Sequence, residues 1–270
     1  MKKTVILLVF LFLLGMTGCN GKPDNTEPTA STPALTKTVY VHSSITQEYS
    51  STVNRTEFLF DEQDHVSQVV VYTNKLVTKR HDVECDENGN YIKWVSDGSV
   101  TEYFYDERGH SLGMSLYVND VLISSTQYTW ENDLRTSITT KMETQGMTQR
   151  ILMTYNNVGH LLRQDVYTAD TLTNYSIYTT DENGRTTAVT IYQPDGTLLS
   201  SSTYTREGLK ETITSTLPDG TVNQIVVLTY DEHGNLLTQE IYDSSNNLVS
   251  KETHTWKAVV VPIDCPRASV

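Results

Sequence analysis

The 270-residue sequence lacks the residue combinations that enzyme families usually display. It has no HExxH zinc motif, no serine nucleophile elbow, no phosphate-binding loop and no dinucleotide-binding fingerprint. None of its seven histidines has a metal-ligand spacing. Three of them, His110, His160 and His233, recur beside the glycine of a repeated turn, which indicates decoration of a repeat. We therefore expect no enzyme activity, no catalytic residue, no bound metal and no cofactor.

Basic residues are also scarce. Twenty Lys and Arg stand against 33 Asp and Glu, which gives a net charge of −13, and the basic residues form no cluster. A chain of this kind is unsuited to bind nucleic acid or anionic lipid headgroups. The apolar fraction of 37% is below the roughly 45–50% of typical globular domains, so we expect half-buried pleated surfaces and no thick core.

Only three cysteines are present, at positions 19, 85 and 265. Cys85 and Cys265 lie far apart in the sequence and have no spacing typical of zinc ligands. In an oxidising compartment they could form a disulfide, or both could remain thiols, and the sequence does not decide between these states.

The N-terminus has the three parts of a secretory signal peptide. Lys2 and Lys3 precede the apolar run Val5–Leu14, which is followed by small residues up to Cys19. The run is too short to span a bilayer, which needs about 20 apolar residues. We expect residues 1–18 to be a signal peptide, and their removal would take two lysines away and change the net charge from −13 to −15.

The segment Met16–Cys19 (MTGC) resembles the lipobox of bacterial lipoproteins. The resemblance implies lipidation of Cys19 and a place outside the cytoplasm, anchored to a bacterial membrane. Acyl chains on this residue would anchor the chain stably. Residues 19–38 are rich in Pro, Thr and Ser, and we expect them to form a flexible tether.

From residue 39 onward the chain repeats with a period of about 25 residues. Turn motifs recur at Asp64, Gly89, Gly109, Gly159, Gly184 and Gly234, and a second set of Asn-, Asp- and Gly-containing turns lies about halfway between them. The stretches between turns are β-branched and aromatic. We predict an all-β domain over residues 39–262, an antiparallel meander of about sixteen strands that forms one long coiled or spiral sheet. Residues 263–270 are a short C-terminal tail.

The segments Tyr105–His110 (YDERGH) and Tyr230–Leu236 (YDEHGNL) resemble the YD repeat of RHS-type proteins. Long members of that family wind such hairpins into a spiral shell that can enclose a toxic domain. This chain has about eight periods, and nothing of a toxin's size follows the last of them. The resemblance therefore implies the hairpin geometry and does not extend to encapsulation.

Two features of the repeat allow a structural or a functional interpretation. The acidic turns, such as Asp86–Asn90, offer calcium-like ligands, but they lack the distal bidentate carboxylate of an EF-hand and contain the residues that tight turns select. Tyr and Trp recur near strand ends, where they could pack across strands or form a row that stacks on glycan rings or contacts a protein.

The main hypothesis is a surface-anchored binding module without catalytic activity, with a protein or glycan partner. The alternative is a structural envelope protein, or an RHS-like shield for another polypeptide. A concave aromatic or polar groove would favour binding, and a closed cavity would favour shielding. Two carboxylates converging in a cleft would favour an enzyme with an unrecognised site, which is the third hypothesis.

Overall fold

The computed structural model describes residues 36–49 and 51–262, which form eighteen β-strands and one short 3₁₀ turn, Glu143–Gln145. The strands are β1 (Thr36–Tyr49), β2 (Thr52–Phe60), β3 (Val66–Thr73), β4 (Leu76–Cys85), β5 (Tyr91–Ser96), β6 (Ser99–Tyr105), β7 (Ser111–Val118), β8 (Val121–Glu131), β9 (Leu134–Met142), β10 (Met147–Tyr155), β11 (Leu161–Thr168), β12 (Thr171–Thr180), β13 (Thr186–Tyr192), β14 (Leu198–Glu207), β15 (Lys210–Thr216), β16 (Val222–Tyr230), β17 (Leu236–Asp243) and β18 (Leu248–Pro262). Among these residues no helix is long and apolar enough to cross a membrane.

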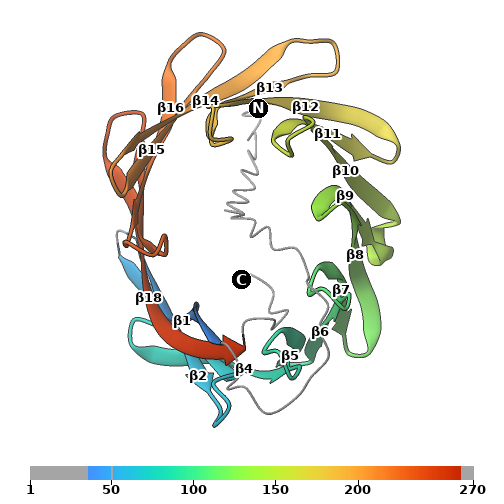
Figure 1. Ribbon diagram of the computed structural model, residues 1–270, viewed down its shortest axis with the longest axis vertical. Helices are drawn as coiled ribbons and strands as arrows, with labels where there is room; N and C mark the ends of the chain where they lie inside the picture. The colour runs from blue at the N-terminus through green and yellow to red at the C-terminus, as the bar shows by residue number, and fades with distance from the viewer. Residues whose placement is uncertain (1–35, 50, 263–270) are drawn as a thin grey trace, which may run out of the picture. The chain divides into compact units, whose positions relative to one another are not determined.

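Every strand pairs antiparallel with its neighbours in the sequence, and β1 also pairs with β18. This last pairing closes the sheet into a barrel, seen as a ring in Figure 1. The prediction of an antiparallel all-β meander is therefore confirmed, but the prediction of an open coiled or spiral sheet is wrong. The pairing that closes the ring joins segments about 200 residues apart, for example Gln47 to Glu252, and no local sequence pattern announces it.

The structure has eighteen strands, two more than the approximately sixteen that the sequence predicted. One connection that the turn residues do not mark is the one between β1 and β2, which contains none of the Gly, Asn or Asp found in the other turns. β1 also begins at Thr36, three residues before the expected boundary of the repeat domain. The predicted signal peptide, the lipidation site Cys19, most of the tether and the tail 263–270 lie outside the described residues.

The turns fold as their residues predict. Asp64 and the five glycines of the first set all have positive φ. In Asp86–Asn90, the Asp86 carboxylate accepts backbone N–H bonds from Asn88 (2.9 Å) and Asn90 (2.8 Å). The same pair of bonds recurs at Asp61, Asp106, Asn156, Asp181, Asp231 and Asp243. Turn geometry thus explains why an Asp or Asn opens these turns.

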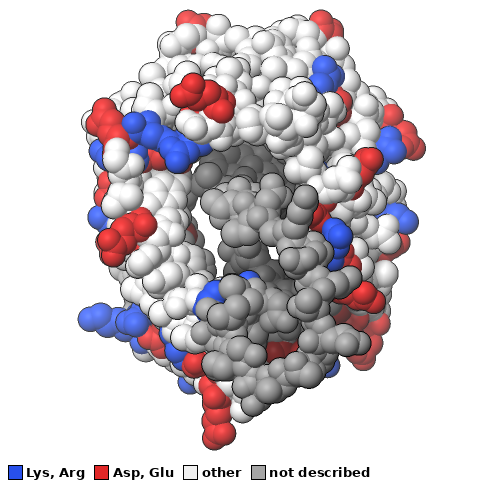
Figure 2. Space-filling model, in the orientation of Figure 1, with Lys and Arg blue, Asp and Glu red and all other residues white. Residues whose placement is uncertain are grey.

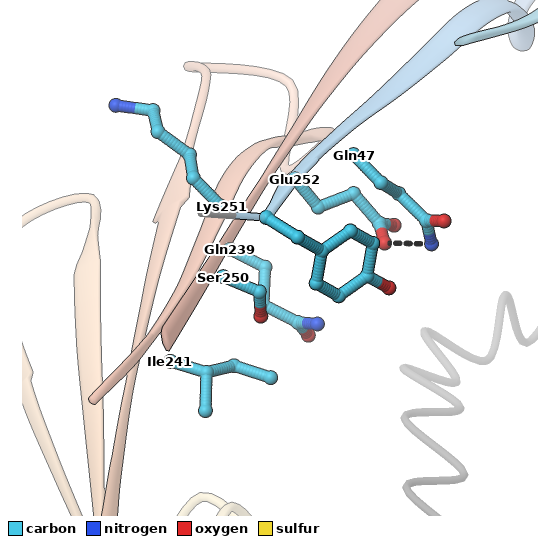
Figure 3. A pocket seen from close by; sticks show the side chains of 7 residues that line it. Gln47, Gln239, Ile241, Ser250, Lys251 and Glu252 are labelled. Atoms are coloured by element: carbon cyan, nitrogen blue, oxygen red, sulfur yellow. Dashed lines mark hydrogen bonds between the residues drawn. The ribbon is translucent and has the colours of Figure 1, made fainter. Parts of the chain in front are cut away.

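The barrel has an inner wall and an outer wall because side chains alternate along each strand. In Figure 3, Gln47, Gln239 and Ser250 point to one side of the sheet while Lys251 points to the other. Strand register carries this assignment from strand to strand, since directly paired residues share a face. The face of Gln47 and Glu252 is the inner wall, and that of Lys251 is the outer wall.

The two walls differ in chemistry. The inner wall carries two small clusters of buried aliphatic side chains, centred on Val69 and Leu228, together with aromatic rings and hydroxyl and amide groups. A third cluster, Val41 with Val259 and Val261, lies on the opposite face of β1 and β18, since Val41 pairs with Lys257. The outer wall carries ion pairs between side chains on one strand or on neighbouring strands. Acidic and basic groups both lie around the outside of the ring in Figure 2.

Candidate functional site

A polar depression lies on the inner wall where the first and last strands meet. We call this region, formed by β1, β17 and β18, the seam. The depression has a volume of about 160 Å³ and is lined by Gln47 and Tyr49 of β1, Gln239 and Ile241 of β17, and Ser250, Lys251 and Glu252 of β18 (Figure 3). Tyr49 keeps 47% of its surface exposed, so its ring is available to a ligand.

Glu252 is the charged group whose side chain faces this depression, since the Lys251 side chain points to the outer wall and pairs with Glu240 at 2.8 Å. Nε2 of Gln47 donates a hydrogen bond of 2.7 Å to its Oε2 atom. Nε2 of His254 lies 2.9 Å from its Oε1 atom, in a contact too bent for a well-formed hydrogen bond. The His254 contact is the main cause that lowers the pKa of Glu252, and the Gln47 bond adds to it. Glu252 is therefore an ionised, fixed acceptor at neutral pH.

Behind Glu252 the structure places two histidines in line. Nε2 of His42 lies 3.1 Å from Nδ1 of His254, and the His42 ring packs on Trp256 with centroids 3.7 Å apart. If His254 carries its proton on Nε2, toward Glu252, its Nδ1 accepts the Nε2–H of His42, which leaves both rings neutral. Burial lowers the pKa of His42 to about 4, with a further contribution from His254.

The Glu252–His254–His42 line resembles the carboxylate and imidazole of a general-base system. A nucleophile would have to stand beside His42. Among the described residues, the contacts recorded for the His42 ring are His254, Trp256 and Phe58. The arrangement brings together residues that the sequence separates by 212 positions.

A continuous row of polar side chains crosses the inner wall at the level of Glu252. Strand register places Gln239, Glu252, Gln47, Asn54 and Thr73 directly beside one another on β17, β18, β1, β2 and β3. We call these five residues the seam row. The Thr73 hydroxyl donates a 2.9 Å hydrogen bond to the Asn54 side chain, as Gln47 does to Glu252.

Seven of the recurrent aromatic residues share one face of the sheet. Tyr103, Tyr128, Tyr155, Tyr178, Tyr204, Tyr230 and Trp256 lie on the inner wall of alternate strands. Burial raises the pKa of Tyr178 and Tyr230 to about 12. The Tyr155 hydroxyl and the Trp256 Nε1 atom donate to backbone carbonyls of the preceding hairpin, those of Arg135 (2.7 Å) and Leu236 (2.8 Å). Most of these rings therefore serve packing, as cross-strand partners do.

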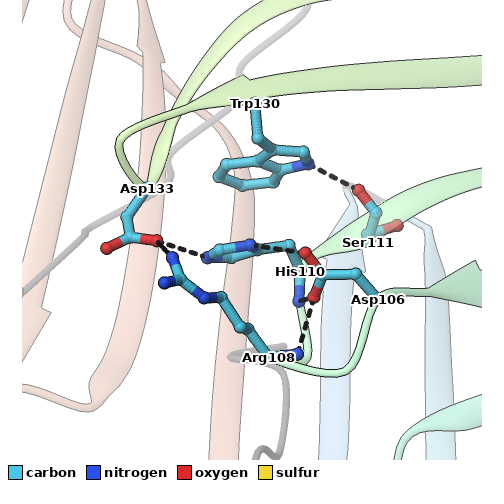
Figure 4. Close-up of polar contacts among 6 residues, drawn as sticks. All are labelled: Asp106, Arg108, His110, Ser111, Trp130 and Asp133. Atoms are coloured by element: carbon cyan, nitrogen blue, oxygen red, sulfur yellow. Dashed lines mark hydrogen bonds and ion pairs between the residues drawn. The ribbon is translucent and has the colours of Figure 1, made fainter.

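The turn histidines also have structural partners. His110 stacks on Trp130 with ring centroids 4.6 Å apart, and its Nδ1 lies 2.9 Å from Asp106. Its Nε2 lies 3.3 Å from Asp133, which also pairs with Arg108 at 2.8 Å (Figure 4). His110 thus ties its own turn to the next turn along the barrel.

The other predicted site residues stay partly untested. Cys85 ends β4 on the inner wall, with its sulfur 3.3 Å from the Val66 carbonyl oxygen. Cys265 lies outside the described residues, so a Cys85–Cys265 disulfide stays a prediction. Among the described residues no group of three or more His, Cys, Asp and Glu is arranged to hold a metal ion. The turn carboxylates are already engaged by backbone N–H groups.

Comparisons with known proteins give distant likenesses. A family model described as "Uncharacterised protein" matches residues 100–221. No curated protein matches the sequence. Among solved structures, TcdB2-TccC3 without its hypervariable C-terminal region is 12% identical with a TM-score of 0.37, and the alignment covers 80% of this chain and 15% of that one. A porin-like protein from Bacteroides uniformis is 11% identical with a TM-score of 0.31, and the alignment covers 80% and 96% of the two chains.

A porin-like protein from Bacteroides vulgatus is 10% identical with a TM-score of 0.29, and 80% of this chain aligns with 98% of that chain. This chain thus spans less than a fifth of the length of the TcdB2-TccC3 chains. At these identities and TM-scores the likenesses carry no functional meaning for this chain.

Proposed function

We propose that this protein is a lipid-tethered binding module outside the cytoplasm that holds its ligand on the inner wall at the seam. The observation that carries the proposal is the depression beside Glu252. It combines a fixed carboxylate, two amides, a hydroxyl and an exposed tyrosine ring. A few convergent polar groups beside an aromatic surface are typical of small-ligand sites.

The proposal assigns the seam no catalytic role, because the hydrogen-bond and ring partners of His42 among the described residues are His254, Trp256 and Phe58, and none of these is a hydroxyl or thiol nucleophile. It also favours a polar, uncharged ligand, since both carboxylate oxygens of Glu252 already contact the polar side chains of Gln47 and His254. The partner is a component of the cell surface, and nucleic acid is not among the candidates for a chain of net charge −13.

The test is capture of envelope components by the full-length protein in mild detergent. We expect the wild-type chain to retain a component that Tyr49→Ala retains at least fivefold less, because the exposed ring forms one side of the depression. Leu59→Ala is the matched control, since Leu59 is also exposed (42%) but lies on the outer wall. Equal retention by both variants would reject the seam as the binding site.

The tether is a separate part of the proposal. Cys19→Ala should abolish incorporation of labelled fatty acid and release the protein from the membrane fraction, while its circular dichroism spectrum stays that of a β protein. A Cys19→Ala chain that remains acylated and membrane-bound would show that the lipobox resemblance is misleading.

The shielding alternative is favoured by one observation, the closure of the sheet through the β1–β18 pairing. A closed barrel can enclose a polypeptide segment, whereas a binding module needs only one face. The two proposals differ in stoichiometry: a shielded polypeptide should co-purify one-to-one and resist protease until the barrel is denatured. Rapid digestion of every co-purifying chain would leave binding as the better explanation.

A further inference from the structure

The seam row has a regular spacing that identifies a class of ligand. Its five side chains stand on five adjacent strands, and neighbouring strands lie about 4.8 Å apart, so the row is about 19 Å long. All five are hydroxyl, amide or carboxylate groups. A ligand that lay along the row would meet one polar group at each step.

We propose that the seam row binds a linear, neutral glycan that runs across the strands from β17 to β3. This inference rests on the proposed function and names its ligand class. The advance per ring of an extended chain of 1,4-linked pyranoses is close to the spacing between strands. Each ring would therefore face one side chain of the row, with its hydroxyl groups exchanging hydrogen bonds with amides and hydroxyls that both donate and accept.

The charge at the row favours a neutral ligand. Glu252 is the row's one ionised group, and its carboxylate oxygens are engaged by Gln47 and His254. An anionic polymer would be repelled by this carboxylate and by the net charge of −13. A ligand that binds Glu252 directly would have to displace the hydrogen bond that Gln47 donates to it.

The backbone argues against an extended peptide. Peptides commonly add a strand to a free sheet edge. At the level of the row, β18, β1 and β2 each pair on both sides, so no main-chain edge is open there. Recognition has to come from side chains, which is how a polyhydroxylated ligand is bound.

Tyr49 completes the site. Its half-exposed ring lies one inward position from Gln47, on the same wall, because successive inward residues are two apart. A tyrosine ring can stack on the C–H face of a pyranose while the row contacts its hydroxyls.

The test is a length series of neutral oligosaccharides, two to seven rings of 1,4-linked glucose or xylose, measured by titration calorimetry against the full-length protein. Affinity should rise with each ring and level off at about five rings, the number of side chains in the row. Gln239→Ala and Asn54→Ala should each weaken binding of the six-ring probe about five- to tenfold. Thr238→Ala and Thr46→Ala, which change the outer wall of the same region, should leave it unchanged.

Two further probes distinguish an error in the ligand class from an error in the binding site. If a neutral Gly–Ser hexapeptide or a six-ring galacturonate binds and the neutral glycans do not, the ligand class is wrong and the proposed function stands. Glycan binding that ignores Gln239→Ala and Asn54→Ala would overturn the row as the site. If no oligosaccharide binds, the inference is rejected, and the envelope capture by wild type and Tyr49→Ala decides the proposed function separately.

Discussion

The inner and outer walls of the barrel are made from the same strands, yet they use different interactions. On the inner wall Leu228 is fully buried against Ile213 and Val226. On the outer wall, charged side chains pair at a partly exposed surface, as Arg163 (38% exposed) does with Asp165 (19%). The comparison teaches that alternate residues of one repeat carry different interactions: the inner wall holds aliphatic clusters and the seam depression, and the outer wall holds ion pairs between neighbouring strands.

The largest expected effect is on hydrophobic packing. Leu228→Ala should lower the free energy of unfolding by about 2–5 kcal/mol, because the substitution leaves a cavity among side chains that cannot fully collapse. Leu59→Ala on the outer wall should change it by less than about 1 kcal/mol. Urea unfolding followed by circular dichroism measures both, and equal losses would erase the distinction between the walls.

Removing an ion pair should also lower the free energy of unfolding more on the inner wall than on the outer wall, by a smaller amount than Leu228→Ala. On the inner wall Arg206 pairs with Glu211, which is 7% exposed, and the Tyr230 hydroxyl also reaches Glu211 at 3.3 Å. Arg206→Ala should cost about 2–3 kcal/mol because it leaves a buried carboxylate without its cation.

The outer-wall control is Arg163→Ala. Asp165 is more exposed than Glu211 (19% against 7%) and Arg163 is 38% exposed, so Arg163→Ala should cost less than Arg206→Ala, and part of the cost should disappear in high salt. A larger loss for Arg163→Ala than for Arg206→Ala would contradict the assignment of the two faces.

The seam should make stability depend on pH. The folded-state pKa of His42 is about 4, below its usual value of 6.5, so the unfolded chain binds the proton more tightly. Stability should therefore fall as pH drops from about 6.5 toward 4, by roughly 1–2 kcal/mol after allowance for partial exposure of the ring.

His42→Phe keeps an aromatic ring on Trp256 and should flatten the stability profile in this window. Asp243, in the turn between β17 and β18, should behave differently. Hydrogen bonds from Asn247 lower the pKa of its carboxyl group, so its contribution to the stability of the fold is lost only in more acidic solution. Thermal unfolding between pH 7 and 4 measures the difference, and an unchanged slope in His42→Phe would show that another group titrates.

Much of the barrel could be predicted because its signals are local. Asp-Gly and Asn-Asp pairs, as at Asp97 and Asn119, mark turns through the positive φ that their geometry requires. Closure could not be predicted, since it depends on Gln47 meeting Glu252 across the whole chain. The line from Glu252 to His42 was missed for the same reason.

The β1–β18 pairing sets the order of events during folding. Hairpins from β2 to β17 can form as soon as each is synthesised, because their contacts are local. The ring closes only after the final strand has arrived, so the last step joins the two ends of the chain across the longest loop in the molecule. A chain cut short before β18 would expose the unpaired edges of β1 and β17, which makes incomplete molecules prone to edge-to-edge aggregation.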